Sequence, residues 1–195
     1  LTDHHGRVRF AYGFDAEQTA RVWYRGGDDA NWTLLLDEAR EHRRMLPLAF
    51  NRNESKVYFS CAGTHGVGGI CLWDIATGTF STLWSGTVSG VEDLMLSFDD
   101  DDIVAIRSMP DRAATTLIDK NAPEAKLLVG LMQQFPGDDV HIESSTPDGK
   151  AVFRVSGDTD PGQFFLYDEA THKATLLFAR RPWIKPAQMA PMAPI

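Results

Sequence analysis

The sequence lacks any uninterrupted apolar run long enough to span a bilayer. Residues 1–5 have neither the basic stretch nor the apolar stretch of a secretory signal. Because the chain begins with Leu1, an upstream leader or segment can have been removed, so localisation stays open between the cytoplasm and the periplasm. With 43% hydrophobic and 24% charged residues, the composition excludes a disordered or collagen-like chain and is typical of a soluble globular protein.

Positive charge is also scarce. The chain carries 19 Lys and Arg against 27 Asp and Glu, a formal net charge of -8. A protein that binds the phosphate backbone needs a concentrated basic surface, so we expect neither a nucleic acid nor a membrane as partner. The only basic cluster, residues 40–44, is interrupted by Glu41 and falls where a connection between repeats is expected. We interpret it as a solvated loop.

The histidines and carboxylates lack the spacing of a metal site. The six histidines are scattered, and the adjacent pair at 4–5 falls in a turn rather than at zinc-ligand spacing. Asp158 to Glu169 matches the spacing of a calcium loop at three positions, but Gln163 replaces the required glycine and a strand intervenes. We therefore predict an ordinary turn there, and no metal.

Two further motifs have plain structural interpretations. The acidic run 99–102 occupies a turn position of the repeat described below, where Asp supports its own backbone. The glycine-rich stretch 63–69 joins two strands and lacks the helix start that a phosphate cradle requires, so we predict a hairpin loop and no cofactor.

The clearest structural pattern lies in residues 141–178, which read as one small antiparallel sheet. β-branched and aromatic runs alternate there with turn sequences rich in Pro, Asp and Gly. The expected strands are 141–145, 151–155, 164–168 and 173–178, separated by turns at 146–149, 158–162 and 169–172. Four strands joined by tight turns in under forty residues are typical of a β-propeller blade.

The same unit recurs along the chain. The turn and the strand after it have counterparts ending at Val8, Val57, Val104 and Val152, which are 49, 47 and 48 residues apart. A second landmark agrees, because residues 72–78 match residues 166–172. A period in the high forties with four short strands per unit favours a propeller over a sandwich.

We therefore predict an all-β fold, a partial propeller of about four blades of four-stranded antiparallel sheets. The blades are 1–44, 45–90, 91–139 and 140–178. The first blade lacks its innermost strand, so 8–12, 21–24 and 32–36 are its remaining strands. In the third blade the spacing of apolar residues after Pro123 predicts a short helix near 123–134 in place of the fourth strand.

Residues 179–195 cannot continue a sheet, because Pro182, Pro186, Pro191 and Pro194 interrupt them. We interpret them as a linker or strap. Together with the turn 156–162 and residues 165–168, this segment (RPW…P…QMAP…PI) resembles the junction between propeller and catalytic domain in bacterial prolyl oligopeptidase family serine peptidases. The nearest subgroup is the dipeptidyl aminopeptidase or acylaminoacyl-peptidase-like enzymes. The match covers about residues 140–195, and the earlier repeats match only in blade pattern.

The resemblance implies a noncatalytic propeller that gates access of short peptides to an α/β-hydrolase domain of the same parent chain. That domain would follow the strap. The family's Gly-x-Ser-x-Gly nucleophile elbow does not occur here, and residues 85–90 have its letters at the wrong spacing. No catalytic residue can be assigned to this chain, and its substrate-binding residues stay unknown. Whether the chain is itself an enzyme is left open, since an autonomous protein-binding propeller and a propeller enzyme with carboxylates at its pore are the alternatives.

Two expectations concern the cysteines and the assembly. A hairpin centred on Gly66 places Cys61 opposite Cys71, and we favour free thiols because a directly paired cross-strand disulfide is strained. An open arc of four blades exposes its ends, which predicts a homodimer of arcs or termini that cap them. The alternative is a four-bladed ring closed within one chain, in which a C-terminal segment supplies the absent strand. The candidates for exposed apolar surface are Val8, Phe10, Trp23, Phe153, Phe165 and Tyr167.

Overall fold

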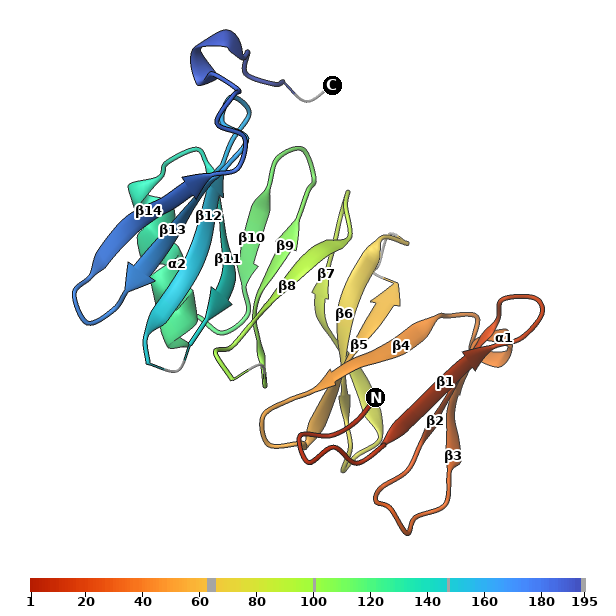
Figure 1. Ribbon diagram of the computed structural model, residues 1–195. Helices are drawn as coiled ribbons and strands as arrows, with labels where there is room; N and C mark the ends of the chain where they lie inside the picture. Colours follow the sequence, from red (N-terminus) through yellow and green to blue (C-terminus); the bar gives the residue numbers. More distant parts are fainter. Residues whose placement is uncertain (63–65, 100, 147, 194–195) are drawn as a thin grey trace. The chain divides into compact units, whose positions relative to one another are not determined.

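The computed structural model describes residues 1–62, 66–99, 101–146 and 148–193. The described residues are mostly β: four small antiparallel sheets, two short α-helices and one 3-10 turn (Figure 1). Contacts divide the chain into two compact units, Leu1–Leu94 with Arg107–Pro110, and Met95–Ile106 with Asp111–Ile195.

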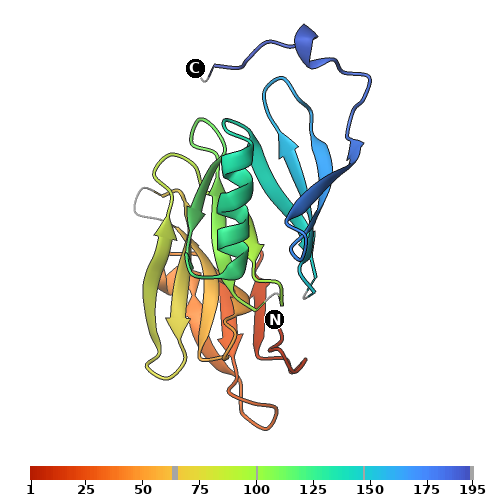
Figure 2. The same cartoon turned by 90° about the vertical axis from the view of Figure 1, so that its left-hand side faces the viewer.

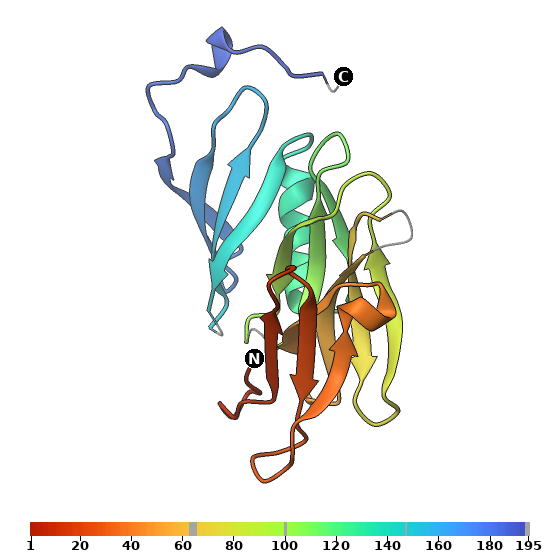
Figure 3. The same ribbon diagram turned by 90° about the vertical axis from the view of Figure 1, so that its right-hand side faces the viewer.

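The first unit contains two sheets whose strands are paired in chain order (Figures 1 and 3). Side chains from both sheets form one core, in which the Phe10 ring lies 5.7, 5.8 and 5.9 Å from the rings of Phe50, Phe59 and Trp73. The strands are β1 (Phe10–Phe14), β2 (Ala20–Tyr24), β3 (Thr33–Asp37), β4 (Met45–Phe50), β5 (Lys56–Ala62), β6 (Gly68–Asp74) and β7 (Thr79–Ser85).

The second unit contains most of a three-stranded sheet, the longer helix and a four-stranded sheet. Helix α2 (Pro123–Gln134) runs beside β11 (Figure 2), and its Leu128 and Leu131 share a core with Val140, Phe153 and Val155 of the sheet. The division between the units falls within β8 and β9. The strands are β8 (Val91–Leu96), β9 (Ile103–Ser108), β10 (Ala114–Leu117), β11 (Asp139–Ser145), β12 (Lys150–Ser156), β13 (Gln163–Asp168) and β14 (Lys173–Ala179).

One kind of turn recurs at all four predicted positions. The side chain of its first residue accepts a hydrogen bond from the backbone N–H of the residue that closes the turn, and the backbone N–H of the first residue donates to the carbonyl of that same residue. Short oxygen-bearing side chains suit such turns because they reach their own backbone. The pairs are Asp3 with Arg7, Asn51 with Lys56, Ser97 with Asp102 and Thr146 with Lys150, with side-chain bonds of 2.9, 2.8, 3.0 and 3.2 Å. The repeated turn is therefore confirmed.

The helix predicted near 123–134 is confirmed as α2, with Pro123 at its start. The interpretation of residues 40–44 as a loop is wrong in part. They are exposed as expected, but α1 (Glu38–Glu41) enters this segment. The Asp37 side chain caps α1 by accepting from the Ala39 N–H at 3.1 Å, and Glu38 accepts from the Ala20 N–H and from Arg44. Contacts to distant residues therefore stabilise a helix of a single turn.

The prediction of free thiols is wrong, because Cys61 and Cys71 form a disulfide with a Cα–Cα separation of 5.9 Å. That they are near neighbours is confirmed. The hairpin register differs by two from the expected one: Cys61 lies opposite Gly69, and Cys71 lies opposite Phe59. The cysteines are thus offset along the ladder, so the directly paired geometry on which the expectation rested does not occur.

Two of the residues expected at an exposed end surface are buried. Phe10 and Phe153 are 1% and 0% exposed, because each packs in the core of its own unit. Trp23, Phe165 and Tyr167 are half-buried, and Val8 is exposed. In the second unit, β14 exposes three consecutive large apolar side chains, Leu176, Leu177 and Phe178, and the C-terminal segment exposes Trp183 and Met192.

Candidate binding groove

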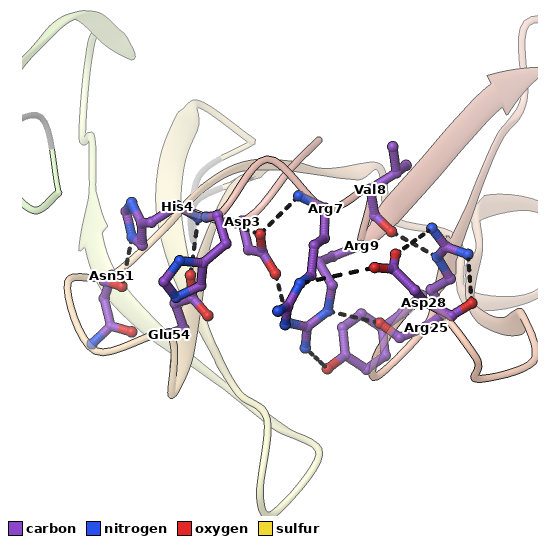
Figure 4. Close-up of polar contacts among 11 residues, drawn as sticks. Asp3, His4, Arg7, Val8, Arg9, Arg25, Asp28, Asn51 and Glu54 are labelled. Atoms are coloured by element: carbon purple, nitrogen blue, oxygen red, sulfur yellow. Dashed lines mark hydrogen bonds and ion pairs between the residues drawn. The ribbon is translucent and has the colours of Figure 1, made fainter.

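Among the residues weighed as metal or phosphate ligands, His4, Asp99 and Asp158 lie in turns, whereas His141 lies in β11 and Gly68 and Gly69 begin β6. His4 binds a neighbouring turn, through its backbone N–H to Glu54 and its ring to the Asn51 carbonyl (Figure 4). Asp158 belongs to the turn between β12 and β13, and Asp99 accepts from the Ser97 hydroxyl between β8 and β9. Residues 63–65 of the glycine-rich stretch, residue 100 of the acidic run, residue 147 of the last repeat turn and residues 194–195 of the strap lie outside the described residues.

Residues 85–90, which contain Gly and Ser at a spacing other than that of the nucleophile elbow, connect two strands. Ser85 ends β7, and the Ser89 hydroxyl accepts a hydrogen bond from the Met109 N–H at 3.0 Å. The segment joins β7 to β8 and is not followed by a helix. It therefore lacks the strand-to-helix turn that exposes a nucleophile.

A groove of about 690 Å³ lies in the second unit, between α2 and the sheet of β11 to β14. One face of the helix forms the first wall, because residues spaced three and four apart lie on the same side. That wall comprises Lys126, Leu127, Gly130, Leu131, Gln134 and Phe135. Leu131 is buried on the core side, whereas Lys126, Gly130 and Gln134 are exposed along the opening.

The opposite wall comes from the end of the sheet where β12 begins and β13 ends. It comprises Gly149, Ala151, Tyr167, Glu169, His172 and Ala174. Three of these six have no side chain beyond a methyl group, and Gly130 faces them from the helix. A Cβ added at Gly130 would meet no atom within 4 Å. The groove thus exists because small residues face each other across it.

Polar groups gather at the opening of the groove. The Tyr167 hydroxyl lies 3.2 Å from the His172 Nδ1, which fixes the orientation of that imidazole. Among the described residues, the Lys126 ammonium and the Glu169 carboxylate have no hydrogen bond or ion pair. An apolar floor with one unpaired cation and one unpaired anion is suited to binding an amphiphilic molecule with charges of both signs.

A second polar arrangement holds the C-terminal segment. The Asp158 carboxylate accepts from the Met192 N–H at 3.0 Å, and Arg112 donates to the Met192 carbonyl at 3.0 Å. Arg112 and Asp158 are themselves 3.5 Å apart, and the Arg180 N–H donates to the Gly162 carbonyl. Both backbone groups of one strap residue are therefore recognised by an ion pair, as in the binding of an extended peptide.

The first unit contains a buried ion pair that stabilises the fold (Figure 4). Arg9 donates to Asp3 at 3.1 Å and to the Tyr24 hydroxyl at 2.8 Å, and its guanidinium lies over the rings of Tyr24 and Phe50. Burial raises the pKa of Asp3, but hydrogen bonds from Arg7, Arg9 and His5 outweigh it and leave that pKa below its usual value. The hydrogen-bond partners of Asp3 and Arg9 come from the surrounding turn and strands, so we assign this ion pair a structural role.

Comparison with protein-family models finds none that matches this chain, and no curated protein matches it either. Function is therefore inferred from the geometry of the site and from the sequence pattern. The helix wall of the groove was foreseeable from apolar spacing. The sheet wall was not, because single Gly and Ala residues in turns and strands form no recognisable motif.

Proposed function

We propose that the four sheets are blades of a β-propeller segment that takes no part in the chemistry but gates access to a serine peptidase of the prolyl oligopeptidase family. The enzyme would cleave short peptides, as dipeptidyl aminopeptidases do. The observation that carries the proposal is the repeated turn. Four copies with the same hydrogen bonds, each leading into an antiparallel sheet, support one unit used four times.

Two further observations support it. Consecutive sheets share a core in the first unit, through Phe10 and Trp73, as stacked blades require. The two segments that carry the family resemblance are bonded to each other, since Met192 binds Asp158 and Arg180 binds Gly162. The strap thus leaves the last sheet at a defined place.

The disulfide bears on location. Stable disulfides are typical of proteins that fold in an oxidising compartment, so Cys61–Cys71 favours the periplasm over the cytoplasm. Among the described residues no helix is long and apolar enough to cross a membrane.

The proposal is tested with the purified chain and chromogenic aminoacyl and dipeptidyl substrates. We expect no turnover and no labelling by a fluorophosphonate, because the residues that the structure describes include no connected nucleophile, base and oxyanion donors. The parent polypeptide is expected both to turn over these substrates and to be labelled by the fluorophosphonate. Stoichiometric labelling and turnover by residues 1–195 alone would overturn the gating role and favour a propeller enzyme.

The second candidate is an autonomous protein-binding propeller module. All seven residues of β14 are exposed, and an exposed edge strand can pair with a partner's strand. This candidate predicts that the parent polypeptide, like the isolated chain, is inert toward the same substrates and the same label.

A further inference from the structure

The groove beside α2 offers a binding site that the gating role does not require. Its volume of about 690 Å³ falls within the range of about 300–1,000 Å³ that small-molecule sites occupy. The floor is apolar, with Leu127, Leu131 and Tyr167. Solvent in such a space is displaced readily by apolar groups.

The charges at the opening narrow the choice of ligand. Lys126 supplies a cation from the helix and Glu169 an anion from the turn after β13, and neither is paired with another described residue. A purely apolar ligand would leave both charges unused, and a ligand of one sign would meet one of them as a repulsion. A molecule with an ammonium, a carboxylate and apolar groups between or beside them satisfies all three features.

We propose that this groove binds short apolar peptides of two or three residues with free ends. The ligand's carboxylate pairs with Lys126, its ammonium pairs with Glu169, and its side chains lie on the floor between α2 and the sheet. The site binds without chemistry, and it is independent of the proposed function: it lies wholly within the second unit and needs no catalytic domain.

Binding is measured by isothermal titration calorimetry on the full 195-residue chain, with the dipeptide leucyl-phenylalanine as the probe. We expect saturable binding with a Kd of about 1 mM or lower. Two derivatives each delete one charge: the N-acetyl form lacks the ammonium, and the amide lacks the carboxylate. Each is expected to bind about two- to fivefold more weakly, which is the effect of losing one exposed ion pair.

Variants of the walls locate the site. Gly130→Trp fills the groove from the helix, where a new side chain meets open space, and should lower the affinity at least about tenfold. Ala174→Trp fills it from the sheet and gives an independent test. Gln133→Trp adds the same bulk to an exposed helix position outside the groove and serves as the matched control, with unchanged affinity expected.

Charge variants test the orientation. Lys126→Met should weaken binding of the free dipeptide but not of its amide, and Glu169→Gln should weaken binding of the free dipeptide but not of its N-acetyl form. The proposal is overturned if the dipeptide gives no saturable heat, or if both tryptophan variants bind it normally. It is equally overturned if the charge-deleted derivatives bind as well as the free dipeptide, since the groove would then accept any apolar molecule.

Discussion

At the scale of single residues, the ion pair of Asp3 and Arg9 is expected to contribute strongly to stability. The Asp3 side chain is fully buried, and that of Arg9 is 11% exposed. Asp3→Asn keeps an oxygen for the turn but leaves the guanidinium without its counter-charge. Removing one member of a buried pair costs about 3–5 kcal/mol, so we expect the free energy of unfolding to fall by that amount in urea denaturation at pH 7.

The control is Asp28→Asn, because the Asp28 carboxylate is 58% exposed and pairs with Arg25 and Arg7 at the surface. It should cost less than about 1 kcal/mol. Since the pKa of Asp3 is lowered by folding, its contribution is present above the unfolded pKa of about 3.9 and is lost as the pH falls through the folded value. An Asp3→Asn cost no larger than that of Asp28→Asn would refute the assignment.

We expect the Asp138 carboxylate to destabilise the folded state at neutral pH, whereas that of Asp3 stabilises it. Burial, and then the nearby charge of Asp160, raise the pKa of Asp138. A carboxyl whose pKa rises on folding destabilises the folded state above that pKa and has no such effect below the unfolded value. Asp138→Asn should therefore stabilise the protein at pH 7 and leave it unchanged near pH 3.

Asp148→Asn is the matched control in the same unit. The hydrogen bond from Thr146, and further the charge of Lys150, lower the pKa of Asp148, although burial opposes them. Asp148→Asn should therefore destabilise the protein at pH 7, whereas Asp138→Asn should stabilise it. Urea denaturation of both variants at pH 7 and pH 3 measures the change in the free energy of unfolding. Changes of the same sign in the two variants at pH 7 would contradict this electrostatic explanation.

At the scale of the elements, the hairpin of β5 and β6 is stabilised by its disulfide. The bridge closes a loop of about ten residues, for which the loss of chain entropy in the unfolded state is worth about 2–3 kcal/mol. Reduction, or the double change Cys61→Ser with Cys71→Ser, should lower the free energy of unfolding by that amount. Peptide mapping with and without reductant checks the bond itself, and two free thiols in protein purified without reductant would contradict it.

Strand β14 is the element we expect to associate. It forms one edge of its sheet and exposes Leu176, Leu177 and Phe178. Exposed edges with apolar side chains pair with other chains unless charges block them. We expect a dimer at micromolar concentration by light scattering, and a shift to monomer in Leu176→Lys or Phe178→Lys. Thr175→Ser, which adds no charge to the same strand, is the control and should leave the dimer intact, and a monomeric unmodified chain would refute the prediction.

The sequence predicted these elements where the pattern was periodic and local. Alternating apolar residues located the strands of the last sheet, and the spacing after Pro123 located α2. Prediction from the sequence failed where contacts between distant residues determine the local structure. α1 depends on Glu38 reaching Ala20 and Arg44, and the offset of Cys61 from Cys71 depends on a strand register that no local signal reveals.

At the scale of the whole molecule, we propose that the four sheets are blades that serve a separate catalytic domain. The repeated turn could be predicted from the valine spacing, whereas the groove required the structure. A small residue on α2 and others on the sheet come together only after folding. Because we propose that the catalytic residues belong to another part of a parent polypeptide, the deciding experiment uses the native polypeptide rather than this chain alone.

The most direct measurement is to isolate the native polypeptide with an antibody against this chain, treat it with a fluorophosphonate probe and map the labelled peptide by mass spectrometry. The account predicts one labelled serine in a sequence that lies C-terminal to residue 195. An unlabelled native polypeptide, or a label within residues 1–195, would contradict it.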